Sequence, residues 1–103
     1  MIGIIYKYTS PSGKCYIGQT IHEELRKAQH KSAAKDESLK WPFYKAIRKY
    51  GWDNMSYEVL VKFECDNRQL LFKILDHFEI FYIAKYNSYK CGYNQTKSGH
   101  IVS

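Results

Sequence analysis

The pattern of side chains at the start of the chain is that of a β-strand. Residues 2–9 mix β-branched, aromatic and small side chains, and a second short run of this kind begins near Tyr16. The intervening Ser10-Pro11-Ser12-Gly13 is typical of a tight turn, because proline presets φ at the first turn position and glycine accepts the left-handed φ that closes a three-residue loop. The pattern predicts a β-hairpin.

The length of this turn decides which side chains share a face. A three-residue loop pairs Tyr8 with Tyr16 and Tyr6 with Gly18, so the three tyrosines would point to one side of the sheet. Gly18 would then leave open space beside the Tyr6 phenol. A loop of two or four residues would put Tyr6 and Tyr16 on opposite faces.

Helical spacing follows the hairpin. The first helix is predicted to begin at a capping box, with Thr20 as N-cap and Glu23 reaching back, and to run to about Lys35. Its apolar residues are sparse, which predicts a narrow buried stripe and an exposed basic face. A second helix is predicted from Pro42 to a C-terminal cap at Gly51.

The second half of the chain predicts one strand and one long helix. Residues 56–63 alternate, with the side chains at 57, 59, 61 and 63 expected on one face. Asp66-Asn67 then caps a helix that runs to about Tyr86 and is apolar almost all round, so we expect it to be the most buried helix. The order β-β-α-α-β-α predicts an α/β (α+β) fold, a small sheet covered by helices.

Length and composition bound the possibilities. A chain of 103 residues with 45% hydrophobic content forms one compact domain. It has no apolar run long enough to span a membrane and no secretory signal, so we expect a cytoplasmic protein that is not secreted. Three widely spaced cysteines (Cys15, Cys65 and Cys91) favour free thiols over a zinc cluster.

The net charge points to a class of partner. The formal charge of +6 favours a polyanion, because binding to a phosphate backbone releases condensed counterions. Charge by itself does not distinguish DNA from RNA, and many small basic proteins bind neither.

Arg26 and His30 stand four residues apart on the first predicted helix and project from one face. A guanidinium matches phosphate oxygens, and a histidine one turn away can move a proton or orient a water. A solvated basic face is the competing interpretation for an isolated pair of this kind.

Glu79 carries more information, because Leu75 and Ile83 one turn away on either side place it on an apolar face. A buried carboxylate needs a partner, which is either a cation such as Arg26 or a lysine, or a hard metal ion such as Mg²⁺. Asp76 and His77 are interpreted as surface residues on other faces of the helix.

Three other residues complete the candidate set. Tyr6 and Tyr16 are poor bases unless a nearby cation lowers their pKa. Asn94 is expected to fix the closing segment through backbone hydrogen bonds.

Five elements in order resemble the GIY-YIG endonuclease family over about residues 2 to 99. They are Gly3-Ile4-Ile5-Tyr6, Tyr16-Ile17-Gly18-Gln19-Thr20, the Arg26/His30 pair, Ala46 to Trp52, and Glu79 followed by Gly92-Tyr93-Asn94. The match looks nearest the phage and viral homing-endonuclease branch. The resemblance implies a three-stranded antiparallel sheet, a catalytic domain at residues 1–99 and a tail at residues 100–103.

The resemblance also implies a function and a site. It implies a metal-dependent DNA endonuclease of low intrinsic specificity, either a homing-enzyme catalytic domain or a stand-alone enzyme. Glu79 would ligate one Mg²⁺ or Mn²⁺ and Arg26 would contact the scissile phosphate. Tyr6 would be the general base, with Tyr16 and His30 positioning water and phosphate and Gly18 and Asn94 supporting the site. DNA is the expected partner of a monomer without a small-molecule cofactor. The alternative is a non-catalytic nucleic-acid-binding module with the same fold.

Overall fold

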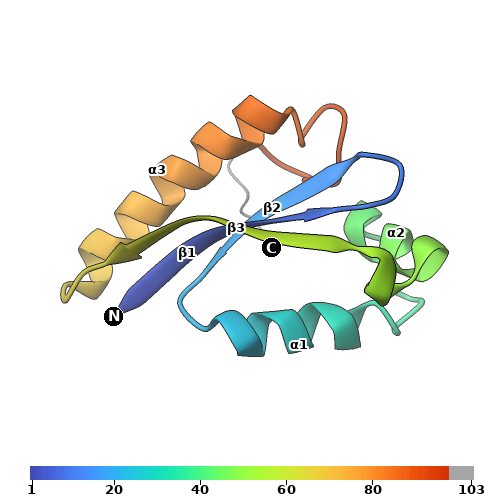
Figure 1. The fold of residues 1–103 in the computed structure, drawn as a ribbon, viewed down its shortest axis with the longest axis horizontal. Coiled ribbons are helices and arrows are strands. Elements are labelled where there is room, and N and C mark those ends of the chain that lie inside the picture. The colour runs from blue at the N-terminus through green and yellow to red at the C-terminus, as the bar shows by residue number, and fades with distance from the viewer. Residues whose placement is uncertain (98–103) are drawn as a thin grey trace.

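The computed structural model describes residues 1–97 and places helices on both faces of a three-stranded antiparallel sheet (Figure 1). The sheet has the strand order β2-β1-β3. Its elements, in chain order, are β1 (Ile2–Thr9), β2 (Cys15–Thr20), α1 (Glu23–Ala33), α2 (Pro42–Tyr50), the 3₁₀ helix η1 (Trp52–Asn54), β3 (Ser56–Glu64) and α3 (Arg68–Tyr86). The predicted order and fold class are confirmed.

The hairpin has the predicted register. Tyr6 pairs with Gly18 and Tyr8 with Tyr16. The Ser10 backbone amide donates to the Lys14 carbonyl at 2.9 Å, which closes the loop. Gly13 has a φ of 88°, the left-handed conformation that the turn requires of its glycine.

The predicted capping box at the start of α1 is wrong. Thr20 is the last residue of β2, where it pairs with Ile4, and α1 begins after His22 without a side-chain cap. The Thr20 hydroxyl accepts the His22 backbone amide at 2.9 Å and shapes the link between strand and helix. Sheet pairing thus uses the residue that the sequence pattern assigned to the helix.

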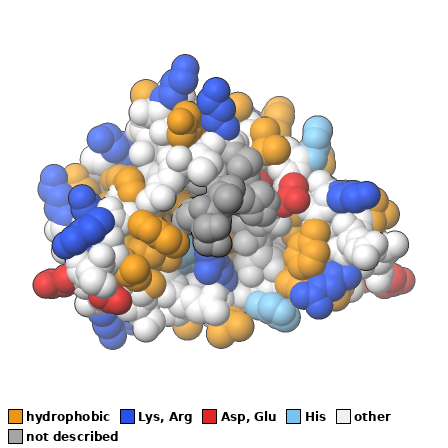
Figure 2. Space-filling model, turned by 180° about the vertical axis from the view of Figure 1, so that it is seen from behind, with side chains coloured by type: hydrophobic (Ala, Val, Ile, Leu, Met, Phe, Trp, Pro, Cys, Tyr) orange, Lys and Arg blue, Asp and Glu red, His pale blue; other side chains and the backbone are white. Residues whose placement is uncertain are grey.

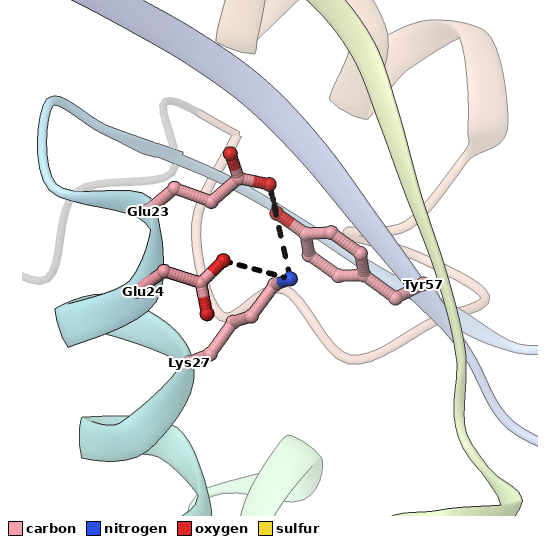
Figure 3. A network of polar contacts seen from close by, with 4 residues as sticks. All are labelled: Glu23, Glu24, Lys27 and Tyr57. Carbon is pink, nitrogen blue, oxygen red and sulfur yellow. Dashed lines mark hydrogen bonds and ion pairs between the residues drawn. The ribbon is translucent and has the colours of Figure 1, made fainter.

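Glu23 anchors α1 to β3 instead of capping the helix. The Tyr57 hydroxyl donates to Glu23 Oε2 at 2.8 Å, and Lys27 Nζ lies 4.2 Å from the centre of the Tyr57 ring (Figure 3). Lys27 also pairs with Glu24 at 3.4 Å and with Glu23 at 3.9 Å. These contacts fix the first turn of α1, which carries Arg26.

β3 contains a bulge that the alternating pattern did not predict. Tyr6 pairs with Val59 and Ile5 with Val61, so one residue of β3 has no partner in β1. Val59 therefore packs in the core under α1 and α2, whereas Val61 packs in the core under α3. The expectation that 57, 59, 61 and 63 share one face is wrong, because a bulge adds a residue and reverses the alternation.

α3 is less buried than expected. One stripe faces the sheet, and several large apolar side chains on the rest of the helix are exposed: Leu70, Phe72, Ile80 and Phe81. A single layer of three strands covers only one side of a helix, so apolar residues all round it cannot all be buried. Figure 1 shows α3 alone on its face of the sheet, with α1 and α2 on the other.

The segment after α3 returns to the free edge of β2. The Asn94 side chain accepts from the Ile17 amide and donates to the Ile17 carbonyl, both at 2.8 Å. The Tyr93 amide donates to the Cys15 carbonyl at 2.9 Å. The segment thereby satisfies backbone groups on the edge strand. The expected domain boundary at residue 99 and the tail at 100–103 lie outside the described residues.

Two further findings concern the described part of the chain. Its three cysteines are free thiols. Between residues 1 and 97 we find no helix with both the length and the hydropathy that crossing a bilayer demands.

Candidate active site

An open cavity of about 560 Å³ lies where the β1–β2 hairpin meets all three α-helices. The hairpin contributes two tyrosines, a glycine and a glutamine, α1 contributes an arginine, and α3 contributes a carboxylate. The lining residues are Tyr6, Tyr16, Gly18, Gln19, Arg26, Ala33, Leu39, Trp41, Tyr44 and Glu79. Four of the five predicted catalytic residues therefore share one cavity.

Arg26 supplies the positive charge of this cavity. Its Nη1 donates to Gln29 Oε1 at 3.3 Å. The ion pairs found among residues 1–97 are Lys7–Glu58, Lys27–Glu23 and Lys27–Glu24, and none of them involves Arg26. The planar guanidinium is suited to bidentate binding of phosphate oxygens, so a phosphodiester in the cavity has a fixed cation to bind.

His30 lies behind Tyr6 and does not line the cavity. Its ring is 1% exposed, with Nε2 2.7 Å from the Tyr6 hydroxyl and Nδ1 3.3 Å from the Tyr44 hydroxyl. Burial, assisted by the charge of Arg26, lowers the pKa of His30 to about 3. A neutral imidazole has one donor and one acceptor nitrogen, which suits a ring held between two hydroxyls.

Both site tyrosines are protonated at neutral pH. Burial raises the pKa of Tyr6 well above its usual value, and Arg26 offsets only part of the shift. Burial likewise raises the pKa of Tyr16 to about 12. From the sequence, these phenols are poor bases unless a nearby cation lowers their pKa; Arg26 does act in that direction, but desolvation is the larger effect.

Gly18 is a glycine because of Tyr6. A Cβ at position 18 would overlap the Tyr6 phenol, both ring carbon and hydroxyl. Tyr6 is itself buried and bound to His30, so it has little room to move.

We therefore expect Gly18→Ala to lower the free energy of unfolding by about 1–3 kcal/mol, the usual cost of overpacking a core. Urea denaturation measures the loss. In a Tyr6→Ala background the ring is gone, and the same substitution should cost much less. An equal cost in both backgrounds would contradict this explanation of the glycine.

Glu79 is 2% exposed, and the stripe of α3 on which it lies continues through Leu75 and Ile83, as predicted. Gln19 Nε2 donates to Glu79 Oε1 at 3.3 Å and to Asp76 Oδ1 at 2.6 Å. One amide thus holds two carboxylates near the cavity.

Asp76 was interpreted from the sequence as a surface residue on another face, and that interpretation is wrong. Residues three apart on a helix are neighbours, so Asp76 and Glu79 are within reach of the same side chain. The i, i+3 spacing was the available signal. The role of Gln19 had no such signal, because its partners are 57 and 60 residues away.

The donor set fits one hard divalent cation. Within residues 1–97 no cluster of three or more His, Cys, Asp or Glu side chains could hold a metal ion, so no all-protein cage is formed there. Mg²⁺ commonly binds one or two carboxylates and takes its other oxygens from water and phosphate. A buried carboxylate that lines an open cavity beside an arginine meets this requirement.

Positive charge extends beyond the cavity. Figure 2 shows Lys and Arg side chains spread over one face of the molecule, with fewer acidic side chains among them. Together with the net charge of +6, these basic side chains favour approach of a polyanion to this face.

A scan against protein-family models finds no match to this chain, and a search of curated proteins finds none either. Two solved structures are similar. One is a point mutant of the catalytic domain of the intron endonuclease I-TevI, with a TM-score of 0.77, 19% identity, and coverage of 94% of this chain and 96% of that one. The other is the catalytic domain of the homing endonuclease I-TevI, with a TM-score of 0.73, 20% identity, and coverage of 91% and 98%. The chain therefore has the fold of a GIY-YIG homing-endonuclease catalytic domain, as the sequence resemblance predicts.

Proposed function

We propose that the chain is a divalent-metal-dependent DNA endonuclease that hydrolyses phosphodiester bonds with low intrinsic sequence specificity. The observation that carries the proposal is the convergence of Arg26, Glu79 and two tyrosines, from three separate parts of the fold, on one open cavity. The fold shared with an endonuclease catalytic domain supports the same reaction class.

The proposed roles follow from position and charge. Arg26 binds the scissile phosphate and stabilises the charge that develops on it. Glu79 holds the cation, with its carboxylate steadied by Gln19. A bound Mg²⁺ or Mn²⁺ supplies Lewis-acid stabilisation and lowers the pKa of a coordinated water. No other small-molecule cofactor is needed for this chemistry, and a monomer contains every residue named.

Tyr6 is the proposed general base, with His30 as its support. The phenol is protonated in the free protein, and the charge of Arg26 acts to lower its pKa, so Tyr6 serves as the base in the fraction of molecules that have lost this proton to solvent. The His30 imidazole, whose pKa is about 3, does not take the proton; its Nε2 lies 2.7 Å from the Tyr6 hydroxyl and holds it in place. His30 is too buried to touch water or phosphate itself, so its role is to position Tyr6. Tyr16 lines the same cavity and is proposed to orient the phosphate.

A second candidate is a nucleic-acid-binding module without catalysis. The raised pKa of both tyrosines favours it, because neither phenol is a ready base. The two candidates differ in one measurable respect: the module binds DNA without a metal and never nicks it.

Supercoiled plasmid tests the proposal. We expect the wild-type protein to nick it in Mg²⁺ or Mn²⁺, and Arg26→Ala to slow nicking by about 10²- to 10³-fold, as for loss of one strong transition-state donor. Lys31→Ala, an exposed cation on the same helix, is the matched control and should nick at a rate near that of wild type. Absence of nicking by the wild type, or nicking by Arg26→Ala at an undiminished rate, would contradict the proposal.

A further inference from the structure

Trp41 forms an aromatic wall of the cavity that the proposed reaction does not use. It lines the cavity together with Arg26 and Glu79, and its side chain is 38% exposed. The other tryptophan, Trp52, is less exposed and packs against the Tyr8 ring of the core at 5.3 Å between ring centres. A large apolar surface left open beside a phosphate-binding arginine needs an explanation.

The Trp41 ring is held in place from beneath. It stacks on Tyr44, with ring centres 5.4 Å apart and planes 15° from parallel. Tyr44 is buried, and its hydroxyl lies 3.3 Å from His30 Nδ1. Pro42 follows Trp41 and restricts its backbone to the extended conformation seen at the N-cap of α2. The indole is therefore a rigid platform, which loses little conformational entropy when a flat group stacks on it.

A flat group that could stack on the indole, the nucleobase, lies next to every phosphodiester of DNA. Every nucleobase has a π-face, and aromatic side chains that bind single strands use stacking on successive bases. In an intact duplex, however, each base has both faces covered by its neighbours. Only a base that has left the stack can present a face to Trp41. The cavity volume of about 560 Å³ is within the range of sites that hold small organic ligands.

We propose that Trp41 stacks on an unstacked base beside the scissile phosphate, so that the protein prefers DNA with an unpaired nucleotide at the cleavage position over fully paired duplex. This inference rests on the proposed nuclease function, because it takes Arg26 as the contact to the adjacent phosphate. It adds the substrate class: bulged or otherwise locally unpaired DNA.

The Trp52→Phe variant makes the experiment direct, because it leaves Trp41 as the sole tryptophan. Binding is measured at low salt, and a chelator is present so that no divalent metal is available for cleavage. The probes are three matched DNA duplexes: one fully paired, one with a single bulged adenine, and one with an abasic bulge at the same place. We expect the bulged adenine to quench Trp41 emission and to bind most tightly. The paired and abasic duplexes should bind more weakly and leave the emission nearly unchanged.

Substitution of the platform gives the second measurement. Trp41→Ala is expected to weaken binding of the bulged adenine by about 5- to 150-fold while binding of the paired duplex stays the same. Trp41→Phe keeps a ring and should recover part of the affinity. Equal affinity for all three duplexes, or equal weakening of all three by Trp41→Ala, would overturn the proposal.

The outcome separates this inference from the proposed function. Plasmid nicking by a protein without preference for the bulged adenine overturns the stacking proposal and leaves the nuclease intact. Selective, quenching binding by a protein that cleaves no DNA with any divalent metal overturns the nuclease and supports stacking on its own.

Discussion

Glu79→Gln is expected to reduce plasmid nicking by about 10³-fold or more at saturating Mg²⁺, because loss of the cation removes several kcal/mol of transition-state stabilisation. The substitution keeps the size and hydrogen-bonding oxygen of the side chain, so the amide of Gln19 still has an acceptor at this position. The fold should survive. The neutral amide is a poor ligand for a hard divalent ion. The variant therefore tests whether the negative charge of Glu79 is needed to bind the metal.

Two measurements check this prediction. Nicking rates are followed as a function of Mg²⁺, and Mn²⁺ binding is followed by electron paramagnetic resonance, which does not depend on activity. Glu58→Gln is the matched control, since this carboxylate is 61% exposed and pairs only with Lys7 in the part of the chain that the structure describes. If Glu79→Gln bound Mn²⁺ as tightly as the wild type, the assignment of Glu79 as the metal ligand would be wrong.

The second large effect concerns the pH dependence of stability through His30. Burial lowers its pKa to about 3 in the folded protein, against 6.5 in the unfolded chain. As pH falls below 6.5, His30 becomes protonated in the unfolded chain but stays neutral in the folded protein, so the free energy of unfolding decreases. The contribution is fully present above pH 6.5 and is lost progressively towards pH 3. At pH 5 the loss from this group is about 2 kcal/mol relative to pH 8.

Urea unfolding of wild type and His30→Gln at pH 5 and pH 8 isolates the effect. Other groups contribute to both proteins, so the difference between them reports His30. We expect the wild type to lose about 2 kcal/mol more than the variant between the two pH values. His77→Gln changes an exposed histidine of α3 and should behave as wild type. A wild-type loss equal to that of His30→Gln would contradict the burial of a neutral imidazole.

The hairpin shows how far local information reaches. The turn at residues 10–13 and the pairing of Tyr6 with Gly18 depend on residues within about a dozen positions of each other. Turn chemistry sets the loop length, and the two-residue period of a strand then decides the face of each tyrosine. The proline at the first position of α2, Pro42, and the caps at Gly51 and Asn67 are local for the same reason, and all three lie where the pattern predicts.

The errors have a common origin. Thr20 looked like a helix cap, but it pairs with Ile4 in the sheet. The bulge in β3 places Val59 and Val61 on opposite faces of the sheet, whereas simple alternation assigned them to the same face. α3 was expected to be buried all round, yet the sheet covers one stripe of it. In the first two cases pairing with another strand overrode a local preference, and in the third no segment within residues 1–97 covers the remaining faces of the helix. The presence or absence of such contacts leaves no periodic signal in one sequence.

The sequence by itself determined the order of elements, the register of the hairpin and the identities of Tyr6, Tyr16, Arg26 and Glu79 as candidates. Only the tertiary structure decided what surrounds them. It placed His30 behind Tyr6 instead of in the cavity, joined Glu79 to Asp76 through Gln19, and set Trp41 at the cavity wall. The physical reason is distance along the chain: burial and hydrogen bonding at this site join residues 14 to 60 positions apart, and only packing brings them together.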